Sequence, residues 1–392
     1  MADWQRRLAK LASRVDSRLD GQREKRGLGA NRPVRIEAYR GFGRPDRLWV
    51  KARVLRGMPA PPAREGDSLW LNLSATLQRF ESDEVPGAAV RVRYPGGEQV
   101  LTADREGYVE CWVDPRPPLS GAAPWREVEM ELVEPAGPAE PFHTGARVLV
   151  PPATARLGVI SDLDDTVVRT DVASRVRMMK HVFFGNAHTR MPFPGVAAFY
   201  RALERGSGPF AHNPFFYVSS SPWNLYEVLA EFLELRKIPA GPLLLRDWGA
   251  SSVDPGEGGH AGHKTRHIST ILELYPTLPF ILVGDSGQED PEIYHRVVHD
   301  HPERILAVYI RNVSRRPERL EAIRELAAEV EKAGSTLILA DDTLAAARHA
   351  ASQGWIDPAA LPEIGDVAHA EDHPRAEELK DENEAMSRGQ QD

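Results

Sequence analysis

The half of the chain beyond about residue 155 alternates between short apolar runs and longer segments with helical periodicity. Expected strands are Leu157–Ser161, Phe215–Ser219, Leu243–Leu245, Phe280–Gly284 and Ile305–Ile310, and expected helices are Val172–Phe184, Gly195–Glu204, Trp223–Arg236, Lys264–Leu274, Glu289–His299 and Pro317–Lys332. A parallel sheet requires such helical crossovers, and its ligands bind at the carboxyl ends of the strands. The alternation therefore predicts an α/β domain over residues 151–360, with helices on both faces of a parallel sheet.

Two carboxylates, Asp162 and Asp164, follow the first of these strands directly. On an extended chain, side chains two residues apart point the same way. Asp162 can then attack a phosphorus atom as a nucleophile, while Asp164 protonates the leaving group and later activates water. An Asp-rich loop after a strand is also common as a turn or helix cap, which is the alternative reading. The similar Asp341-Asp342-Thr343 lacks the first aspartate and is predicted to cap a helix over Leu344–Gln353.

The second and third strand-end segments carry hydroxyl and amine groups. Ser219 ends the aromatic strand from Phe215, where its hydroxyl and nearby backbone N–H groups can cradle phosphate oxygens. Lys264 opens a helix, a position that is slightly unfavourable for a cation, and can hold a phosphate and stabilise Asp162. The alternatives are an ordinary N-cap serine and a solvated surface lysine.

The fourth segment is a strand that runs into Gly284-Asp285-Ser286-Gly287-Gln288-Glu289-Asp290-Pro291. Oxygen-rich loops of this kind bind hard cations, and a phosphate dianion needs such a cation to approach a carboxylate. The candidate ligands of a Mg²⁺ ion are Asp162, Asp164 through its carbonyl, Asp285, and Asp290, with Asp290 or Glu289 positioning a ligand or water around it. A helix capped by aspartate and beginning at Pro291 is the alternative.

The order Asp, Ser, Lys, Asp at four successive sites resembles the haloacid dehalogenase (HAD) superfamily. The strings SDLDDTVVRTDV, YVSSSPWNLY, HKTRHISTIL and VGDSGQEDPEIY further resemble the actin-patch-associated, lipin-like phosphatidate phosphatase family, over roughly residues 155–357. The resemblance implies a HAD-like fold, Mg²⁺-dependent hydrolysis of phosphatidate to diacylglycerol and phosphate, and phosphate binding by Thr166, Ser219, Ser220 and Lys264.

The cap over such a site is expected to be minimal, because residues 170–194 and 246–263 are too few for a full cap domain. An open site accepts a bulky or surface-bound phosphate monoester. Together with the family resemblance, this makes a phosphorylated lipid the expected substrate. The alternatives are a phosphatase for soluble phospho-metabolites or phosphoproteins, and a regulatory or scaffolding protein that keeps only the HAD fold.

Residues 34–150 contain short β-prone runs separated by turns such as Pro95-Gly96-Gly97. These runs predict a small β-sandwich domain, whose partner the sequence does not identify. The predicted strands are Val34–Tyr39, Leu48–Leu55, Ala88–Tyr94, Gln99–Thr102, Tyr108–Val113, Val128–Val133 and Arg147–Val150.

Residues 1–30 are predicted to form an amphipathic helix in which Trp4, Leu8, Leu11, Val15 and Leu19 share one face. Packing on the protein itself is favoured because acidic residues dilute the basic face, and peripheral contact with an anionic membrane is the alternative.

Composition bounds the remaining possibilities. The formal net charge is −8, and much of it lies in the acidic segment 366–392, which is predicted to be a disordered tail. The chain shows no basic stripe interleaved with aromatic residues, which argues against nucleic acid as a partner. Cys111 is the single cysteine, so no intrachain disulfide can form. Together with the lack of a long apolar segment, this predicts a cytoplasmic protein.

Overall fold

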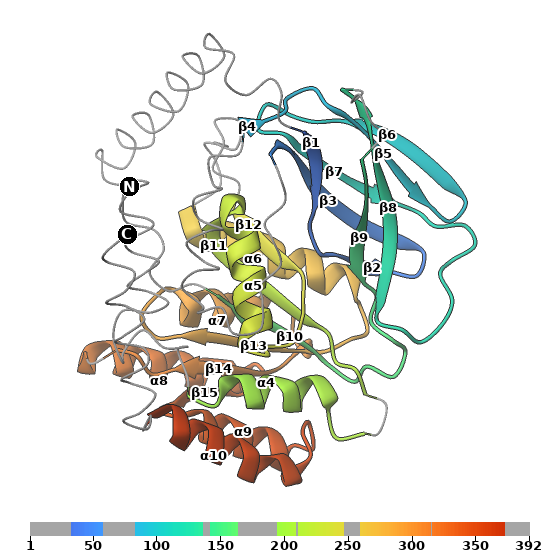
Figure 1. The fold of residues 1–392 in the computed structure, drawn as a ribbon. Helices are drawn as coiled ribbons and strands as arrows, with labels where there is room; N and C mark the ends of the chain where they lie inside the picture. The colour runs from blue at the N-terminus through green and yellow to red at the C-terminus, as the bar shows by residue number, and fades with distance from the viewer. Residues whose placement is uncertain are drawn as a thin grey trace, which may run out of the picture.

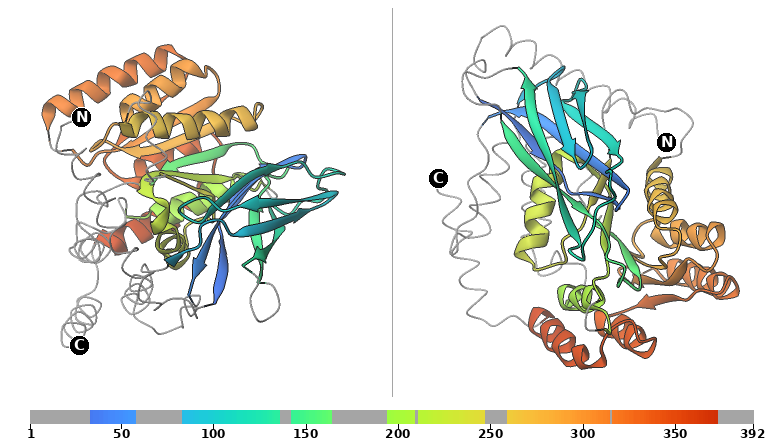
Figure 2. Two further views of the ribbon diagram at one scale, coloured as in Figure 1. Left: turned by 90° about the horizontal axis from the view of Figure 1, so that it is seen from above. Right: turned by 90° about the vertical axis from the view of Figure 1, so that its right-hand side faces the viewer.

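The computed structural model describes residues 33–57, 83–135, 142–163, 194–208, 211–246, 259–314 and 316–372. These residues form a mainly antiparallel β domain and an α/β domain built on a parallel sheet, side by side (Figures 1 and 2). The mixed architecture predicted from the sequence is confirmed at this level.

The β domain is one nine-stranded sheet with the order β1-β3-β2-β9-β8-β5-β6, in which β4 and β7 also pair with β3. Its strands are β1 Val34–Ala38, β2 Gly41–Arg44, β3 Arg47–Arg56, β4 Asp83–Glu84, β5 Ala89–Tyr94, β6 Gly97–Thr102, β7 Tyr108–Val113, β8 Trp125–Glu134 and β9 His143–Leu149. The sheet folds over a shared core to which β3, β5, β8 and β9 contribute Val50, Val90, Val128 and Val148. The hydrogen-bonded strands thus form one continuous sheet that folds over this core.

Strand β2 joins the two halves of this sheet and was not predicted. It pairs antiparallel with β3 and parallel with β9. Its glycines are poor strand formers, but they allow a close approach: a Cβ on Gly41 would lie 2.2 Å from the carbonyl oxygen of Trp49, and one on Gly43 would lie 2.3 Å from that of Arg47. Backbone proximity, which a propensity scale does not register, therefore decides this strand.

The α/β domain has a six-stranded sheet in the order β12-β11-β10-β13-β14-β15, and every neighbouring pair is parallel. The strands are β10 Gly158–Asp162, β11 Phe215–Pro222, β12 Leu243–Arg246, β13 Phe280–Asp285, β14 Ile305–Arg311 and β15 Leu337–Ala340. They agree with the five predicted strands to within a few residues and add β15.

The helices follow the predicted alternation. They are α4 Val196–Arg205, α5 Tyr226–Leu235, α6 Gly259–Leu274, α7 Asp290–Asp300, α8 Pro317–Lys332, α9 Thr343–Ser352 and α10 Leu361–Asp372, with 3₁₀ turns η1 Trp223–Leu225 and η2 Pro358–Ala360. Asp342 caps α9 as predicted, since its carboxylate accepts a hydrogen bond from the Ala345 N–H at 2.7 Å.

The two domains share part of one hydrophobic core. Tyr39 of the β domain stacks on Trp223 with 5.0 Å between ring centroids, and Phe42 meets Phe216 edge-on at 5.9 Å. Aromatic contacts of this kind add to the gain from apolar burial. The β domain and the parallel sheet are therefore packed as one body and are not joined only by the linker at Pro151-Pro152.

Three of the predicted segments lie wholly or partly outside the described residues. They are the amphipathic helix over 1–30, the helix within 164–193 and the acidic tail. The first residues of the predicted tail are helical instead, because α10 continues to Asp372, with Ile364 buried and Val367 packed on the core. Within the described ranges, no helix is both long enough and apolar enough to cross a bilayer.

Candidate active site

The candidate site lies where the strand order of the parallel sheet reverses. From β10 the chain proceeds outward to β11 and β12, and then returns to form β13 on the other side of β10. Such a reversal leaves a crevice at the carboxyl ends of the two central strands, where α/β proteins bind ligands. Asp162 is the last residue of β10 and Asp285 the last of β13, so the fold brings these two predicted site residues to that crevice.

Lys264 enters the crevice from α6, which begins at Gly259 and not at Lys264 as predicted, and pairs with two aspartates. Its Nζ lies 2.7 Å from Oδ1 of Asp162 and 2.9 Å from Oδ1 of Asp290. The lysine is 1% exposed and Asp290 is fully buried. The alternative of a solvated surface lysine is therefore wrong, since this ammonium neutralises charge inside the protein, where an unpaired carboxylate would be costly.

The loop after β13 orients its own carboxylates. Asp285 Oδ1 accepts hydrogen bonds from the N–H groups of Gly287 and Gln288 at 2.6 and 3.2 Å. Asp290 Oδ2 accepts one from the N–H of Asp285 at 3.2 Å. Asp290 thus spans the loop and Lys264 instead of capping α7, whose N-cap residue is Glu289 and lacks a side-chain cap bond.

Glycine at position 284 is required by this packing. A Cβ there would lie 2.5 Å from Oδ2 of Asp290. A larger residue would therefore push the buried carboxylate away from Lys264.

The negative charges of the site affect the pKa of Tyr294, a buried residue of α7. Burial raises the pKa of Tyr294 well above 10, and the charges of Asp290 and Asp162 raise it further. Its hydroxyl stays protonated and donates to the carbonyl oxygen of Val283 at 3.0 Å. This bond ties α7 to the strand that ends at Asp285.

The predicted phosphate-binding serines lie at the end of β11, next to β10. Ser219 and Ser220 are buried, as is the neighbouring Ser221, for which no role was predicted. The N–H of Ser221 donates to Oγ of Ser219 at 3.0 Å, whereas η1 begins after Pro222 with no side-chain cap bond. Ser219 therefore shapes the turn at the strand end and is not the N-cap serine of the alternative reading.

The support of the acidic loop by Arg319 and Glu292 was not predicted. Arg319 of α8 forms a two-contact ion pair with Glu292 and donates through Nε to the carbonyl oxygen of Ser286 at 3.0 Å. Oγ of Ser286 in turn accepts from the N–H of Val313 at 2.9 Å. Arg319 is far from the loop in sequence and has no motif around it, so no local pattern indicates its role.

The donor chemistry of the site fits a small divalent cation. Among the described residues, Asp162, Asp285 and Asp290 each offer a carboxylate oxygen, and these atoms lie within 4.8 Å of one another. Three carboxylates face one ammonium, which leaves an excess of negative charge, and hard oxygen donors are the ligands that Mg²⁺ prefers. Asp164 and Thr166, the other predicted site residues, lie outside the described residues.

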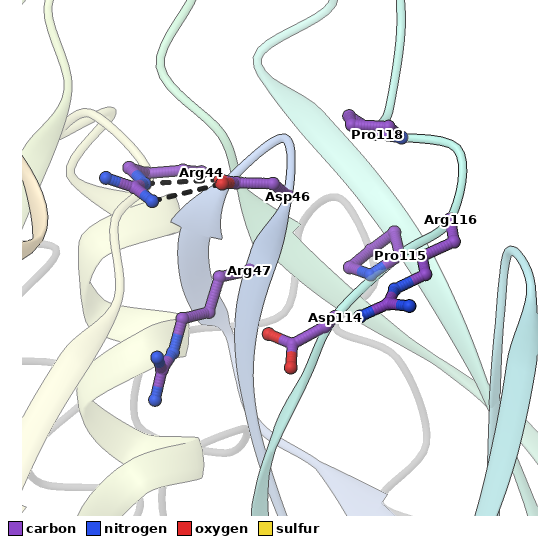
Figure 3. A pocket seen from close by; sticks show the side chains of 7 residues that line it. All are labelled: Arg44, Asp46, Arg47, Asp114, Pro115, Arg116 and Pro118. Carbon is purple, nitrogen blue, oxygen red and sulfur yellow. Dashed lines mark hydrogen bonds and ion pairs between the residues drawn. The ribbon is translucent and has the colours of Figure 1, made fainter.

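A separate hollow lies on the β domain, near the turn between β2 and β3 (Figure 3). Its charges are partly paired among themselves, since Arg44 bonds Asp46 at 3.1 Å. None of the predicted site residues belongs to its lining, which consists of Arg44, Asp46, Arg47, Asp114, Pro115, Arg116 and Pro118.

Comparisons with known proteins point to the same part of the chain. The family model for the catalytic domain of phosphatidate phosphatase APP1 matches residues 157–312. Phosphatidate phosphatase APP1 of Saccharomyces cerevisiae is 35% identical over 156 residues, which are 40% of this chain and 26% of the yeast protein. An uncharacterized protein of Schizosaccharomyces pombe is 27% identical over 161 residues, 40% of this chain and 25% of that protein. The chain thus matches about a quarter of the length of each relative.

Likeness to solved structures is weak. The crystal structure of a carbohydrate acetylesterase from Xanthomonas citri aligns with a TM-score of 0.25 and 12% identity, over 74% of this chain and 72% of that one. Similarity at this level supports no conclusion about fold or function.

Proposed function

We propose, from the match of residues 157–312 to the family model for the APP1 phosphatidate phosphatase catalytic domain, that this chain is a Mg²⁺-dependent phosphatase that converts phosphatidate to diacylglycerol and phosphate. The observation that carries the proposal is the buried cluster of Asp162, Lys264, Asp285 and Asp290 at the reversal point of the sheet. A HAD-type fold for the α/β domain is part of the same proposal, supported by the parallel sheet and by the motif residues at its strand ends.

In the proposed reaction, an Asp162 carboxylate oxygen attacks the phosphorus atom and the bond from phosphorus to the ester oxygen breaks. Asp164 supplies the proton that the leaving oxygen takes up, so diacylglycerol departs as a neutral alcohol. Water then attacks the phosphorus of the aspartyl-phosphate while Asp164 accepts a proton, which restores the Asp162 carboxylate and releases phosphate.

Lys264 and the serines have supporting parts in this proposal. The Lys264 ammonium, 2.7 Å from Asp162, stabilises the charge of the nucleophile and of the incoming phosphate. Ser219 and Ser220, with Thr166, would contact phosphate oxygens. Asp162, Asp285 and Asp290 would hold Mg²⁺, which when bound neutralises phosphate charge and allows an anionic nucleophile to approach.

A lipid substrate also fits the small number of residues available for a cap. The segments that would form this cap, 170–194 and 246–263, lie largely outside the described residues. Contact of the protein with a membrane surface, and its presence in the cytoplasm, remain predictions from the sequence.

The test is phosphate release from phosphatidate in mixed micelles and from a soluble aryl phosphate, with Mg²⁺ or with a chelator. We expect wild-type protein to hydrolyse phosphatidate in the presence of Mg²⁺ and Asp162→Asn to lose hydrolysis without unfolding. Asp300→Asn, at the exposed end of α7, is the matched control and should keep full activity. Unchanged turnover by Asp162→Asn would overturn the mechanism, and turnover of the aryl phosphate alone would overturn the substrate.

A further inference from the structure

The strand that carries the phosphate-binding serines continues directly into a segment held by the β domain. β11 ends at Pro222, and η1 follows with Trp223, Asn224 and Leu225 before α5 begins. The β domain lies outside the residues that match the family model, yet it contacts this segment on several sides.

Trp223 is enclosed by side chains of the β domain. It is 4% exposed and stacks on Tyr39, with an angle of 19° between the ring planes. The Nζ of Lys51 lies 4.5 Å from the Trp223 ring centroid. A cation over an indole face is the most favourable of the cation–π contacts. Trp223 is thus anchored in the β domain, one residue beyond the strand that carries the serines.

Asn224 makes polar contacts with the same domain. Its Oδ1 accepts from Arg53 Nη1 at 2.9 Å and from the hydroxyl of Tyr108 at 3.2 Å. Asn224 itself is exposed, whereas Arg53 and Tyr108 are buried. The exposed Asn224 thus accepts hydrogen bonds from two buried residues. This arrangement indicates that Arg53 and Tyr108 hold the turn in position.

Arg53 is fixed rigidly enough to act as such a support. It donates through Nε to the carbonyl oxygen of Glu106 at 2.8 Å and through Nη2 to Glu84 at 2.7 Å. Its guanidinium also lies 4.6 Å from the Tyr108 ring centroid. A planar guanidinium with its donors engaged in several directions has little freedom to move.

From this geometry we infer that Arg53 and Tyr108 are positioning residues of the phosphatase site, acting through Asn224 on the turn at Ser219–Pro222. The inference rests on the proposed function, because the group positioned is the candidate phosphate cradle. It makes the β domain a part of the phosphate-binding site rather than an appended module. Displacing a positioned group by about 1 Å can lower the rate of an enzyme up to about 100-fold.

The experiment compares Asn224→Ala, Asn224→Asp, Tyr108→Phe and Arg53→Met in the full chain. Asn224→Ala removes the acceptor of both bonds and, since the side chain is exposed, leaves no cavity. Asn224→Asp keeps Oδ1 and adds a charge opposite Arg53, so it serves as the conservative rescue. Arg91→Met is the matched control, because Arg91 pairs with Glu131 at 2.8 Å elsewhere in the β domain.

The readouts are KM and kcat for the aryl phosphate, and the binding of inorganic phosphate measured by calorimetry with Mg²⁺ present. We expect Asn224→Ala to raise KM and to weaken phosphate binding about tenfold, with a smaller change in kcat and with the folded structure retained by circular dichroism. Tyr108→Phe and Arg53→Met should also raise KM and weaken phosphate binding. Asn224→Asp and Arg91→Met should keep the wild-type KM and phosphate affinity. If Arg53→Met fails to fold, the Asn224 pair decides the outcome.

The two proposals fail in different ways in this experiment. Wild-type protein that neither hydrolyses the ester nor binds phosphate would overturn the proposed function. Active wild-type protein, combined with an Asn224→Ala variant of wild-type KM and phosphate affinity, would overturn the positioning role alone. An equal loss in Asn224→Ala and Asn224→Asp would also overturn it, because the acceptor oxygen would then not be what holds the turn.

Discussion

Replacing Lys264 by methionine tests whether its ammonium is the internal counter-ion of the site. Methionine has nearly the shape of lysine, so the change removes charge with little loss of packing. In the wild-type protein, one buried Nζ lies 2.7 Å from Asp162 and 2.9 Å from Asp290. Breaking a buried ion pair by removing one partner costs about 3–5 kcal/mol, because the remaining charge is left without compensation.

We therefore expect Lys264→Met to lose about 3–5 kcal/mol of unfolding free energy in the presence of a chelator, measured by urea titration followed by circular dichroism. Added Mg²⁺ should restore part of this loss, since a bound ligand at about 100 times its Kd stabilises the folded state by about 2.7 kcal/mol. Phosphatase activity should be lost under both conditions.

Lys332→Met is the matched control for this experiment. Lys332 is exposed in the last turn of α8, so its loss should change stability by no more than about 0.5 kcal/mol. The reasoning would be refuted by a Lys264→Met variant as stable as the control in chelator, since the three carboxylates would then tolerate one another without the ammonium.

Further substitutions test other parts of the structure. Gly284→Ala should raise the Mg²⁺ concentration for half-maximal activity at least about tenfold, because the new Cβ displaces Asp290; an unchanged Mg²⁺ titration would contradict this. Arg319→Met should raise the same concentration by loosening the acidic loop that Arg319 ties to α8, and should leave the parallel sheet intact by circular dichroism. Burial, and then repulsion from Glu227, raise the pKa of Glu37 from 4.5 to about 8, so the protonated carboxyl stabilises the fold at low pH and this contribution is lost between about pH 4.5 and 8. Glu37→Gln should therefore flatten the decline of melting temperature over that range, and a slope equal to that of wild type would refute the assignment.

Local sequence patterns were sufficient to predict the strands and helices of the α/β domain, because the apolar residues of these elements recur with a clear period. The buried run Phe280–Asp285 and the helix Pro317–Lys332 lie where apolar spacing predicts them. The positions of Asp162 and Asp285 were predictable for a related reason, since a polar residue at the end of a buried parallel strand lies at the carboxyl edge of the sheet.

Contacts between residues far apart in the sequence determine the features that local patterns did not predict. β2 exists because two glycines allow close backbone approach to β3, a feature that depends on a partner strand and not on the residues of β2 themselves. Thr166 and Asp164 lie outside the described ranges, and the catalytic, phosphate-binding and metal-binding roles of the other predicted site residues also stay predictions.

The sequence by itself therefore determined the order of strands and helices and the chemical groups at the strand ends, because periodicity and turn chemistry act over a few residues. Only the tertiary structure decided that Asp290 shares Lys264 with Asp162, that Arg319 holds the acidic loop, and that Arg53 and Tyr108 reach Asn224 from another domain. These contacts join residues far apart along the chain, and their partners are selected by how the two sheets pack, which no local pattern encodes.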